Sequence, residues 1–224
     1  LRPQVDELVV ISNVPGSVPA GVEAIQNDRP LGFAANVNLG IARTIGEAVV
    51  ISNADAVAEP GAIGALREVM RAHPRCGVAG PRMIFPDGSP QPSRRRFPTV
   101  GGTIVRRTPL RRLIDQRRHL HLDEAAPTEP VEADWMLGGF LLLRRAMLDE
   151  LGGFDPGFRL YGEDIDLQYR AMRAGWERWY VPAATVRHGH AAVTDRRFLT
   201  RRTLWHWRGV LRFVRKHPER LRAL

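Results

Sequence analysis

The sequence predicts an α/β fold, in which short buried strands alternate with amphipathic helices. Continuous apolar runs at residues 8–11 and 48–52 are typical of buried strands. Between them, Val37, Ile41 and Ile45 recur at four-residue spacing, which is typical of a helix. The chain has 224 residues, with 44% hydrophobic and 25% charged. This length is enough for one sizeable domain, and the composition excludes a disordered tail or a membrane bundle.

The first half of the chain predicts a mixed, mostly parallel sheet flanked by helices. Turn signals such as Pro15-Gly16 and Gly46 separate the predicted elements. A helix is expected to open at Pro60 and to end at His73-Pro74. Parallel α/β sheets bind ligands outside the carboxyl ends of their strands. The expected elements are strands 8–11 and 22–25, helix 36–45, strand 48–52, helix 60–73 and strand 77–80.

The second half predicts a long loop region followed by further alternating elements. Residues 86–134 are rich in Pro, Gly and Arg and end in an acidic stretch, so we expect a long loop over the active face. Order is expected to return at Trp135. The expected elements are strand 140–143, helix 145–151, a helix from Gly162 to Gly175, and strand 179–181 before Pro182.

The net charge of +9 is concentrated in the C-terminal tail. From residue 196 onward there are ten basic residues and one acid, whereas the body is neutral. The body shows no basic and aromatic groove, so nucleic acid is not an expected partner. Cys76 is the only cysteine, which excludes an intramolecular disulfide and favours a reducing compartment. Without an apolar run of ~18 residues or a signal peptide, we expect a cytoplasmic protein, soluble or peripheral on a membrane.

The tail, residues 196–224, predicts an amphipathic helix with two stripes. One interpretation is that the apolar stripe packs on the domain. The other is that residues 198–216 lie on an anionic membrane surface, with Trp205 or Trp207 at the boundary. The apolar stripe is Leu204, Trp207, Leu211 and Val214, and the basic stripe is Arg201, Arg208, Arg212 and Arg215.

Asn53-Ala54-Asp55 follows the predicted strand 48–52 directly. A carboxylate at the carboxyl end of a buried strand, followed by a helix at Pro60, lies where a divalent cation and a phosphate could meet. The plainer interpretation is an ordinary turn aspartate.

A second acidic site is Glu163-Asp164-Ile165-Asp166, at a helix start. Acids at this position gain from the helix dipole without any further role. At ~100° per residue, however, Asp164 and Asp166 point to nearly opposite faces. Asp166 can pair with Arg170 one turn on, which leaves Glu163 and Asp164 for chemistry.

Two weaker patterns complete the candidate residues. His188 and His190 share one face of an extended segment and could reach a metal, although such histidines are usually structural. Residues 32–40 form a turn of small residues leading into a helix start, with Asn36 and Asn38, which suits close approach by a ligand.

Six segments, taken in order, resemble glycosyltransferase family 2, the inverting enzymes with the GT-A fold, and most of all its bacterial rhamnosyltransferase-like branch. The resemblance covers residues 5–218. The segments are GFAANVNLGI, VVISNADAVAEPGAI, VAGPRMIFPDGSPQPSRRRFPT, DWMLGGFLLLRRAM, LGGFDPGFRLYGEDIDLQYRAMRAGW and VPAATVRHGH.

The resemblance implies a role for each candidate residue. Asp55 matches the aspartate that holds Mg²⁺ or Mn²⁺ on the sugar nucleotide, with Asn53 in the first position of that motif. Asp164 matches the general base and Glu163 its partner. His188, rather than His190, matches a histidine near the metal and diphosphate. The residues that match the donor pocket are Asn38, Trp135, Gly138 and Gly139.

The resemblance also implies the function. We expect transfer of a sugar, with rhamnose the candidate, from a nucleotide-diphosphate donor to a glycan or lipid-linked glycan in cell-wall or polysaccharide biosynthesis. A base must deprotonate the acceptor hydroxyl while a cation absorbs charge on the leaving diphosphate. Residues 1–195 would form the transferase domain. The alternatives are a non-catalytic remnant and a membrane-binding module.

Two departures from the family pattern are visible. Family members open with a strand and a helix before the segment that matches residues 8–11, and this sequence lacks both. We therefore expect an N-terminally incomplete or degenerate domain. Ser12 and Asn13 stand where the family has an aspartate that contacts the base.

Overall fold

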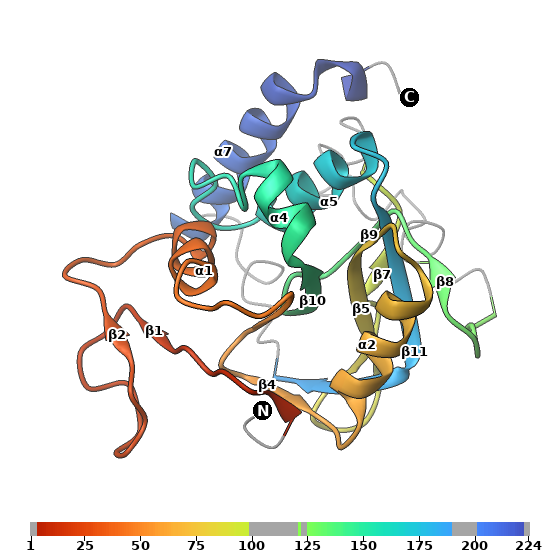
Figure 1. Ribbon diagram of the computed structural model, residues 1–224. Coiled ribbons are helices and arrows are strands. Elements are labelled where there is room, and N and C mark those ends of the chain that lie inside the picture. The colour runs from red at the N-terminus through yellow and green to blue at the C-terminus, as the bar shows by residue number, and fades with distance from the viewer. Residues whose placement is uncertain (1–3, 99–120, 122–124, 190–200, 222–224) are drawn as a thin grey trace.

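The computed structural model describes residues 4–98, 121, 125–189 and 201–221 (Figure 1). Its elements alternate between strands and helices, as an α/β fold requires. In chain order they are β1 (Ile11–Ser12), β2 (Ile25–Gln26), α1 (Phe33–Ile41), β3 (Ala48–Ser52), β4 (Ala56–Ala58), α2 (Ala62–Ala72), β5 (Cys76–Ile84), β6 (Pro90–Gln91), β7 (Arg94–Arg95), β8 (Val131–Glu132), β9 (Trp135–Met136), β10 (Phe140–Arg144), α4 (Arg145–Leu151), α5 (Glu163–Arg173), β11 (Glu177–His188), α7 (Arg201–Lys216) and the 3-10 helix η3 (Pro218–Leu221).

The main sheet has seven strands and is mixed. Its central order is β3-β10-β5-β11-β4, with β6 added to β5 and β8 to β11. The predicted α/β fold with a mixed sheet is confirmed, but the prediction of mostly parallel pairing is wrong. Among the described strands of this sheet, only β5 and β11 pair in parallel. Strand β10 enters between β3 and β5 in the opposite direction, and β4, β6 and β8 are antiparallel to their partners. The long strands β3, β5 and β11 nevertheless share one direction.

Two hydrophobic cores cover the two faces of the sheet. Side chains alternate along β10, so Leu141 and Leu143 lie in the core with α1, α4 and α5, while Phe140 and Leu142 lie in the core with α2. Figure 1 shows α2 on one side of the sheet and α4 and α5 on the other. All four of these β10 side chains are at most 1% exposed. The apolar run that predicted strand 140–143 therefore fills both cores.

Several expected elements occur as predicted, and others differ at their ends. Strand 48–52 and helix 145–151 have the expected bounds, and Cys76 is buried. Helix α1 begins and ends about one turn earlier than the expected 36–45. Strand β11 continues through Pro182 to His188, because Pro182 lies in a register shift between Val181 and Thr185, where no ladder hydrogen bond is needed. His188 therefore ends a strand instead of following one.

The tail forms helix α7, but its inward face differs from the predicted stripe. Gly209, Phe213 and His217, four residues apart, are buried. Leu204 and Leu211 of the predicted stripe are 52% and 62% exposed. Phe213 joins a third cluster with four other aromatic side chains, which are Phe97, Trp135, Phe158 and Tyr169. The interpretation that the predicted apolar stripe packs on the domain is thus wrong, because aromatic packing and ion pairs orient the helix differently.

Strand β3 lies at an edge of the described sheet. Among the residues that the structure describes, it pairs only with β10, and its other edge borders a cavity of about 890 Å³. Residues 4–9, α1 and α2 form the other walls of this cavity. Within the described ranges, none of the helices is long and apolar enough to cross a membrane.

Candidate active site

One side of the candidate site lies where β3 and β11 end. The turn after β3 carries Asn53 and Asp55, and His188 is the last residue of β11. His188 Nε2 lies 3.3 Å from Asn53 Nδ2 and 3.4 Å from Asp55 Oδ1. The Gly189 amide donates to the Asp55 carbonyl oxygen, which joins the two strand ends. Three candidate residues, two from the turn after β3 and one from the distant end of β11, therefore meet here.

The His188 ring is held in one orientation by Gln91 of β6. Its Nδ1 lies 3.1 Å from Gln91 Oε1, and this oxygen can only accept, so Nδ1 carries a proton. In the neutral ring, Nε2 then keeps its lone pair and faces Asn53 and Asp55. A histidine fixed in this way through its second nitrogen is typical of a metal ligand. The His188 side chain is 5% exposed and that of Asp55 is 50% exposed. On this side of the site, the Asp55 carboxylate is therefore the group that is accessible to solvent.

The other side of the site is the first turn of α5. Asp164 Oδ2 accepts a hydrogen bond from the Gly138 amide at 3.0 Å, and Oδ1 accepts one from the Ile165 amide at 2.9 Å. The carbonyl oxygen of the next residue, Gly139, accepts a hydrogen bond from the backbone N–H of Asn53 at 2.9 Å. The two consecutive glycines thus connect the α5 side with the strand-end side.

Both glycines are needed because the backbone passes close to functional side chains. A Cβ at position 138 would lie 2.9 Å from Asp164 Cβ, and one at position 139 would lie 3.1 Å from His188 Cε1. Contacts at these distances are closer than ordinary van der Waals contact. Absence of a side chain at this turn lets the carboxylate and the imidazole face the same backbone segment.

Glu163 and Asp164 differ in their surroundings although they are neighbours. Glu163 is 7% exposed, and among the described residues its buried Oε2 has no hydrogen-bond partner. Burial, followed by the charge of Asp164, raises the pKa of Glu163 to about 8. Burial also raises the pKa of Asp164, against the lowering effects of the Gly138 and Ile165 amides and the positive charge of Arg95. Asp164 accepts two amide hydrogen bonds and Glu163 Oε2 accepts none among the described residues, so a single negative charge on the pair is better stabilised on Asp164, with the proton on Glu163.

Two other predicted donor-site residues have interior partners. Trp135 is 4% exposed, and its indole N–H donates to the Arg96 carbonyl at 2.9 Å. The Asn38 side chain bridges α1 to the Phe154 backbone, donating to its carbonyl at 2.7 Å and accepting from its amide at 2.9 Å. Among the described residues, neither side chain contacts Asn53, Asp55 or His188 at the strand ends. Their donor-binding roles stay predictions.

Asn36, two residues before Asn38 on α1, lies closer to the site. It lines the cavity beside β3 together with Ser52 and Asn53. Its Oδ1 accepts from Asn27 Nδ2 at 2.8 Å, and the same amide donates to Asn13 Oδ1 at 2.9 Å. This group of three asparagines gathers at the ends of β1 and β2 and the start of α1.

The donor set at the strand ends fits a hard divalent cation that also binds phosphate. Mg²⁺ and Mn²⁺ sites of this type use one or two protein ligands and complete their coordination with phosphate oxygens and water. Asp55 supplies an exposed carboxylate and His188 an oriented nitrogen. In the described part of the chain no group of three or more His, Cys, Asp or Glu side chains forms a metal site by itself. His190 lies outside the described residues.

Some residues of this site carry no signal in the sequence. Gln91 orients His188 from a two-residue strand within the loop region, and Arg95 acts on Asp164 from the same region. Gln168 on α5 bonds both the amide and the carbonyl of Met136. Gln168 lies four residues after Asp164, so its position on the helix was predictable, but its partner was not.

Comparison with known proteins identifies the family. The family model described as "Glycosyltransferase like family 2" matches residues 4–206. The chain belongs to this family. It is 33% identical to an N-acetylglucosaminyl-diphospho-decaprenol L-rhamnosyltransferase of Mycobacterium tuberculosis over 93% of this chain and 78% of that protein. It is 37% identical to rhamnosyltransferase WbbL of Escherichia coli over 36% of this chain and 30% of that protein.

Solved structures show the same fold. The structure of GalNAc-T7 with UDP, GalNAc and Mn²⁺ superposes on this chain with a TM-score of 0.56 and 20% sequence identity, covering 75% of this chain and 32% of that chain. The mannosyltransferase PcManGT from Pyrobaculum calidifontis, in complex with GDP-Man and Mn²⁺, superposes with a TM-score of 0.50 and 16% sequence identity. The match covers 82% of this chain and 47% of that chain. The chain is therefore a family 2 glycosyltransferase with the GT-A fold.

Proposed function

We propose that this glycosyltransferase transfers a sugar, with rhamnose the first candidate, from a nucleotide-diphosphate donor to a lipid-linked glycan, with inversion at the anomeric carbon. The observation that carries the proposal is the turn at Gly138 and Gly139, which faces Asp164 on one side and His188 with Asn53 on the other. A base and a leaving-group site must flank one reacting carbon, and this turn lies between the two. The names of the rhamnosyltransferase relatives support the sugar and the acceptor class.

Asp164 would accept the proton of the acceptor hydroxyl. Its two oxygens each accept one amide hydrogen bond, which fixes the carboxylate while leaving further lone pairs open. Glu163, protonated near neutral pH, keeps a second negative charge away from the base. A carboxylate whose pKa is raised by burial is a stronger base than one in water, which suits proton removal from a hydroxyl.

Asp55 and His188 would hold Mg²⁺ or Mn²⁺, which supplies positive charge to the diphosphate leaving group when bound. Asn53 would orient the donor beside them. The cavity of about 890 Å³ reaches from Asn53 along β3 and falls in the range of small-molecule pockets, so we assign the nucleotide to its Asn36 end. The role of Trp135 and Asn38 in the donor site would then be to support its walls.

The decisive experiment is transfer by the purified chain. It is incubated with Mn²⁺ or Mg²⁺, a panel of nucleotide-diphospho-sugars that includes rhamnose donors, and N-acetylglucosaminyl-diphospho-polyprenol. Mass spectrometry detects the product, and NMR gives its anomeric configuration. Metal-dependent transfer with inversion is expected. A folded chain without nucleotide affinity would instead support the alternative, a non-catalytic remnant.

The outward face of α7 supports contact with an anionic membrane surface at the cytoplasmic side. Leu204 and Leu211 are exposed, and Arg208 and Arg215 are exposed beside them. These four residues follow one another at spacings of four, three and four, so they share one stripe of the helix. Apolar side chains flanked by arginine are typical of helices that lie on anionic lipid. Such a surface would bring the enzyme to a lipid-linked acceptor.

Vesicle sedimentation tests this contact. The chain should bind anionic vesicles at low salt and be released at high salt, and the double variant Leu204→Gln/Leu211→Gln should bind less. Ile45→Gln is the matched control, because Ile45 is 87% exposed on another part of the surface. If the double variant and the control bind equally well, α7 is not the membrane contact.

A further inference from the structure

Helix α7 contacts the backbone turn that leads into Glu163 and Asp164. Tyr161 and Gly162 in this turn have φ angles of 68° and 93°, the left-handed region that a tyrosine rarely adopts. Gly209 of α7 lies directly against it, and a Cβ there would be 2.5 Å from the Tyr161 carbonyl oxygen. The rings of His206 and Tyr161 are also in edge contact, with centroids 5.5 Å apart. The strained turn is thus covered by α7 at a distance that only glycine allows.

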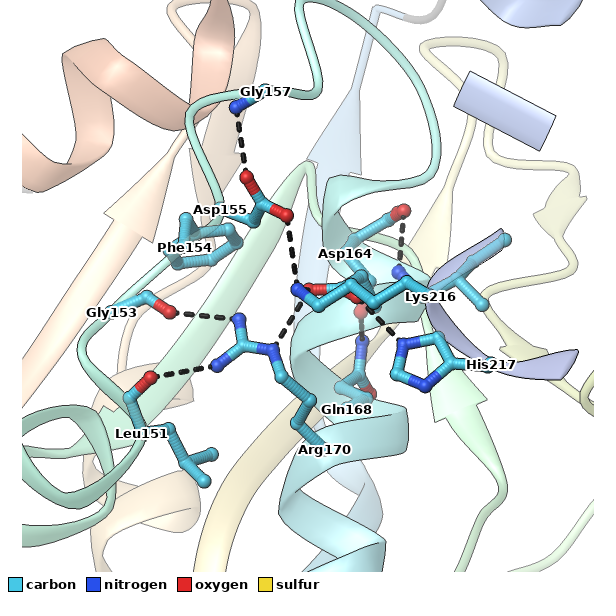
Figure 2. Close-up of polar contacts among 12 residues, drawn as sticks. Leu151, Gly153, Phe154, Asp155, Gly157, Asp164, Gln168, Arg170, Lys216 and His217 are labelled. Atoms are coloured by element: carbon cyan, nitrogen blue, oxygen red, sulfur yellow. Dashed lines mark hydrogen bonds and ion pairs between the residues drawn. The ribbon is translucent and has the colours of Figure 1, made fainter. Parts of the chain in front are cut away.

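The end of α7 makes a second contact, with the buried carboxylate of Asp166. Lys216 Nζ lies 3.0 Å from its Oδ2, and His217 Nε2 lies 2.8 Å from its Oδ1. The Nε of Arg170, one turn further along α5, lies 2.8 Å from Asp166 Oδ2. Burial alone would raise the pKa of Asp166, but the His217 hydrogen bond and the charges of Arg170 and Lys216 outweigh it, so the pKa is lowered. Figure 2 shows Lys216, His217 and Arg170 converging from α7 and α5.

The same network fixes the loop before the turn. Lys216 also contacts Asp155 at 3.0 Å, and Arg212 contacts Asp155 at 2.8 Å. Arg170 donates to the carbonyls of Leu151 and Gly153 (Figure 2). Lys216, the only lysine in the sequence, therefore joins the loop after α4, the start of α5 and the end of α7.

The opposite side of the first turn of α5 faces the site. Gln168 holds α5 to Met136 with bonds of 2.8 and 2.7 Å, and its amide also donates to the Asp164 carbonyl at 3.1 Å. On this side the Asp164 carboxylate accepts from Gly138. The turn that carries Asp164 is accordingly held from both sides, by β9 with Gly138 and by α7.

We propose that α7, together with His217 directly after it, is a positioning element of the active site, in which Gly209, Lys216 and His217 hold the segment 161–166 so that the Asp164 carboxylate faces Gly138. The inference rests on the proposed function, because that function makes Asp164 the base whose position matters. Among the contacts of the described residues, none joins Gly209, Lys216 or His217 to Asn53, Asp55 or His188. These three are therefore positioning residues and act through Asp166 and Tyr161.

The first test is amide hydrogen exchange of the full chain, measured by mass spectrometry on peptides that cover residues 158–168. Lys216→Met removes two ion pairs, and Gly209→Ala inserts a Cβ against Tyr161 without changing charge. Each should speed exchange in this segment by about ten-fold or more. Lys216→Arg keeps both carboxylate contacts and should restore slow exchange. Unchanged exchange in Lys216→Met and Gly209→Ala would overturn the proposal.

Two matched controls separate positioning from general stability. Arg173→Met removes an exposed ion pair between the far end of α5 and Glu219, whose atoms lie 2.8 Å apart. Gly64→Ala adds a Cβ in α2 where no atom lies within 4 Å. Neither should change exchange in 158–168. If the controls speed it as much as the α7 variants do, the effect is global and the proposal is wrong.

The second readout is kinetic and is made well below the melting temperature of each variant. Lys216→Met and Gly209→Ala should lower kcat about ten-fold or more while the donor KM stays within about two-fold, because α7 acts on the base and not on the donor side. An equal rise in donor KM with kcat unchanged would overturn the inference. If the parent chain transfers no sugar, the proposed function fails, whereas the exchange result still decides whether α7 holds the turn.

Discussion

The two sides of the site place carboxylates in opposite environments. Asp55, at the end of a strand, is half exposed beside an oriented imidazole. Glu163 and Asp164, at the start of a helix, are held in an interior whose burial raises the pKa of both. An exposed carboxylate is suited to a hydrated cation, and a buried one is suited to proton transfer. The difference shows how one residue type can serve two chemical roles at opposite sides of a two-glycine turn.

The strongest way to break this comparison is Asp164→Asn. The amide keeps the size of the side chain but cannot take a proton, so kcat should fall by about 10²–10⁴-fold. Donor binding, measured by calorimetry with the nucleotide diphosphate and Mn²⁺, should stay unchanged because the donor residues are on the other side. A loss of donor affinity as large as the loss of kcat would mean that the two sides do not have separate roles.

Asp55→Asn tests the open side. Removing one charged ligand should lower transfer by on the order of 10²-fold, since the cation supplies several kcal/mol of stabilisation to the leaving group. Titration with Mn²⁺ should show a higher concentration for half-maximal activity. Activity that is insensitive to both Asp55→Asn and chelation would contradict a metal role for this side.

Gly138→Ala tests the connection between the sides. Its Cβ would lie 2.9 Å from Asp164 Cβ, so the base must shift, and kcat should fall by roughly ten-fold. Gly64→Ala is the control, with open space around its Cβ. A crystal structure of the variant would show whether Asp164 has moved from the amide at position 138. Full activity of Gly138→Ala would mean that the close approach is not required.

The smallest effect is on stability, through Glu163→Gln. A carboxyl group whose pKa rises from 4.5 unfolded to about 8 folded binds more protons in the folded state, so the parent loses stability as pH rises between these values. Glutamine does not titrate. The variant should therefore gain in melting temperature relative to the parent more at pH 8 than at pH 5. Parallel pH profiles of the two proteins would show that Glu163 is not buried as a neutral acid.

Much of the fold was predictable because local patterns determine it. The run at 48–52 and the helix at 145–151 occur with the expected bounds, and Asp166 pairs with Arg170 as its spacing predicts. The direction of β10 was not predictable, because an apolar run has the same sequence pattern in either direction. The extent of β11 was also missed, since a proline inside a strand depends on a register shift made with β5.

The sequence by itself determined the residue types and their local settings: carboxylates at a strand end and at a helix start, consecutive glycines, and a basic amphipathic tail. Only the tertiary structure decided which of them meet. It turned α7 so that Gly209, Lys216 and His217 face the domain while Leu204 and Leu211 face outward. The physical reason is that helical periodicity defines the faces of a helix, whereas ion pairs with Asp155 and Asp166 and backbone contact at Tyr161 select the face that packs.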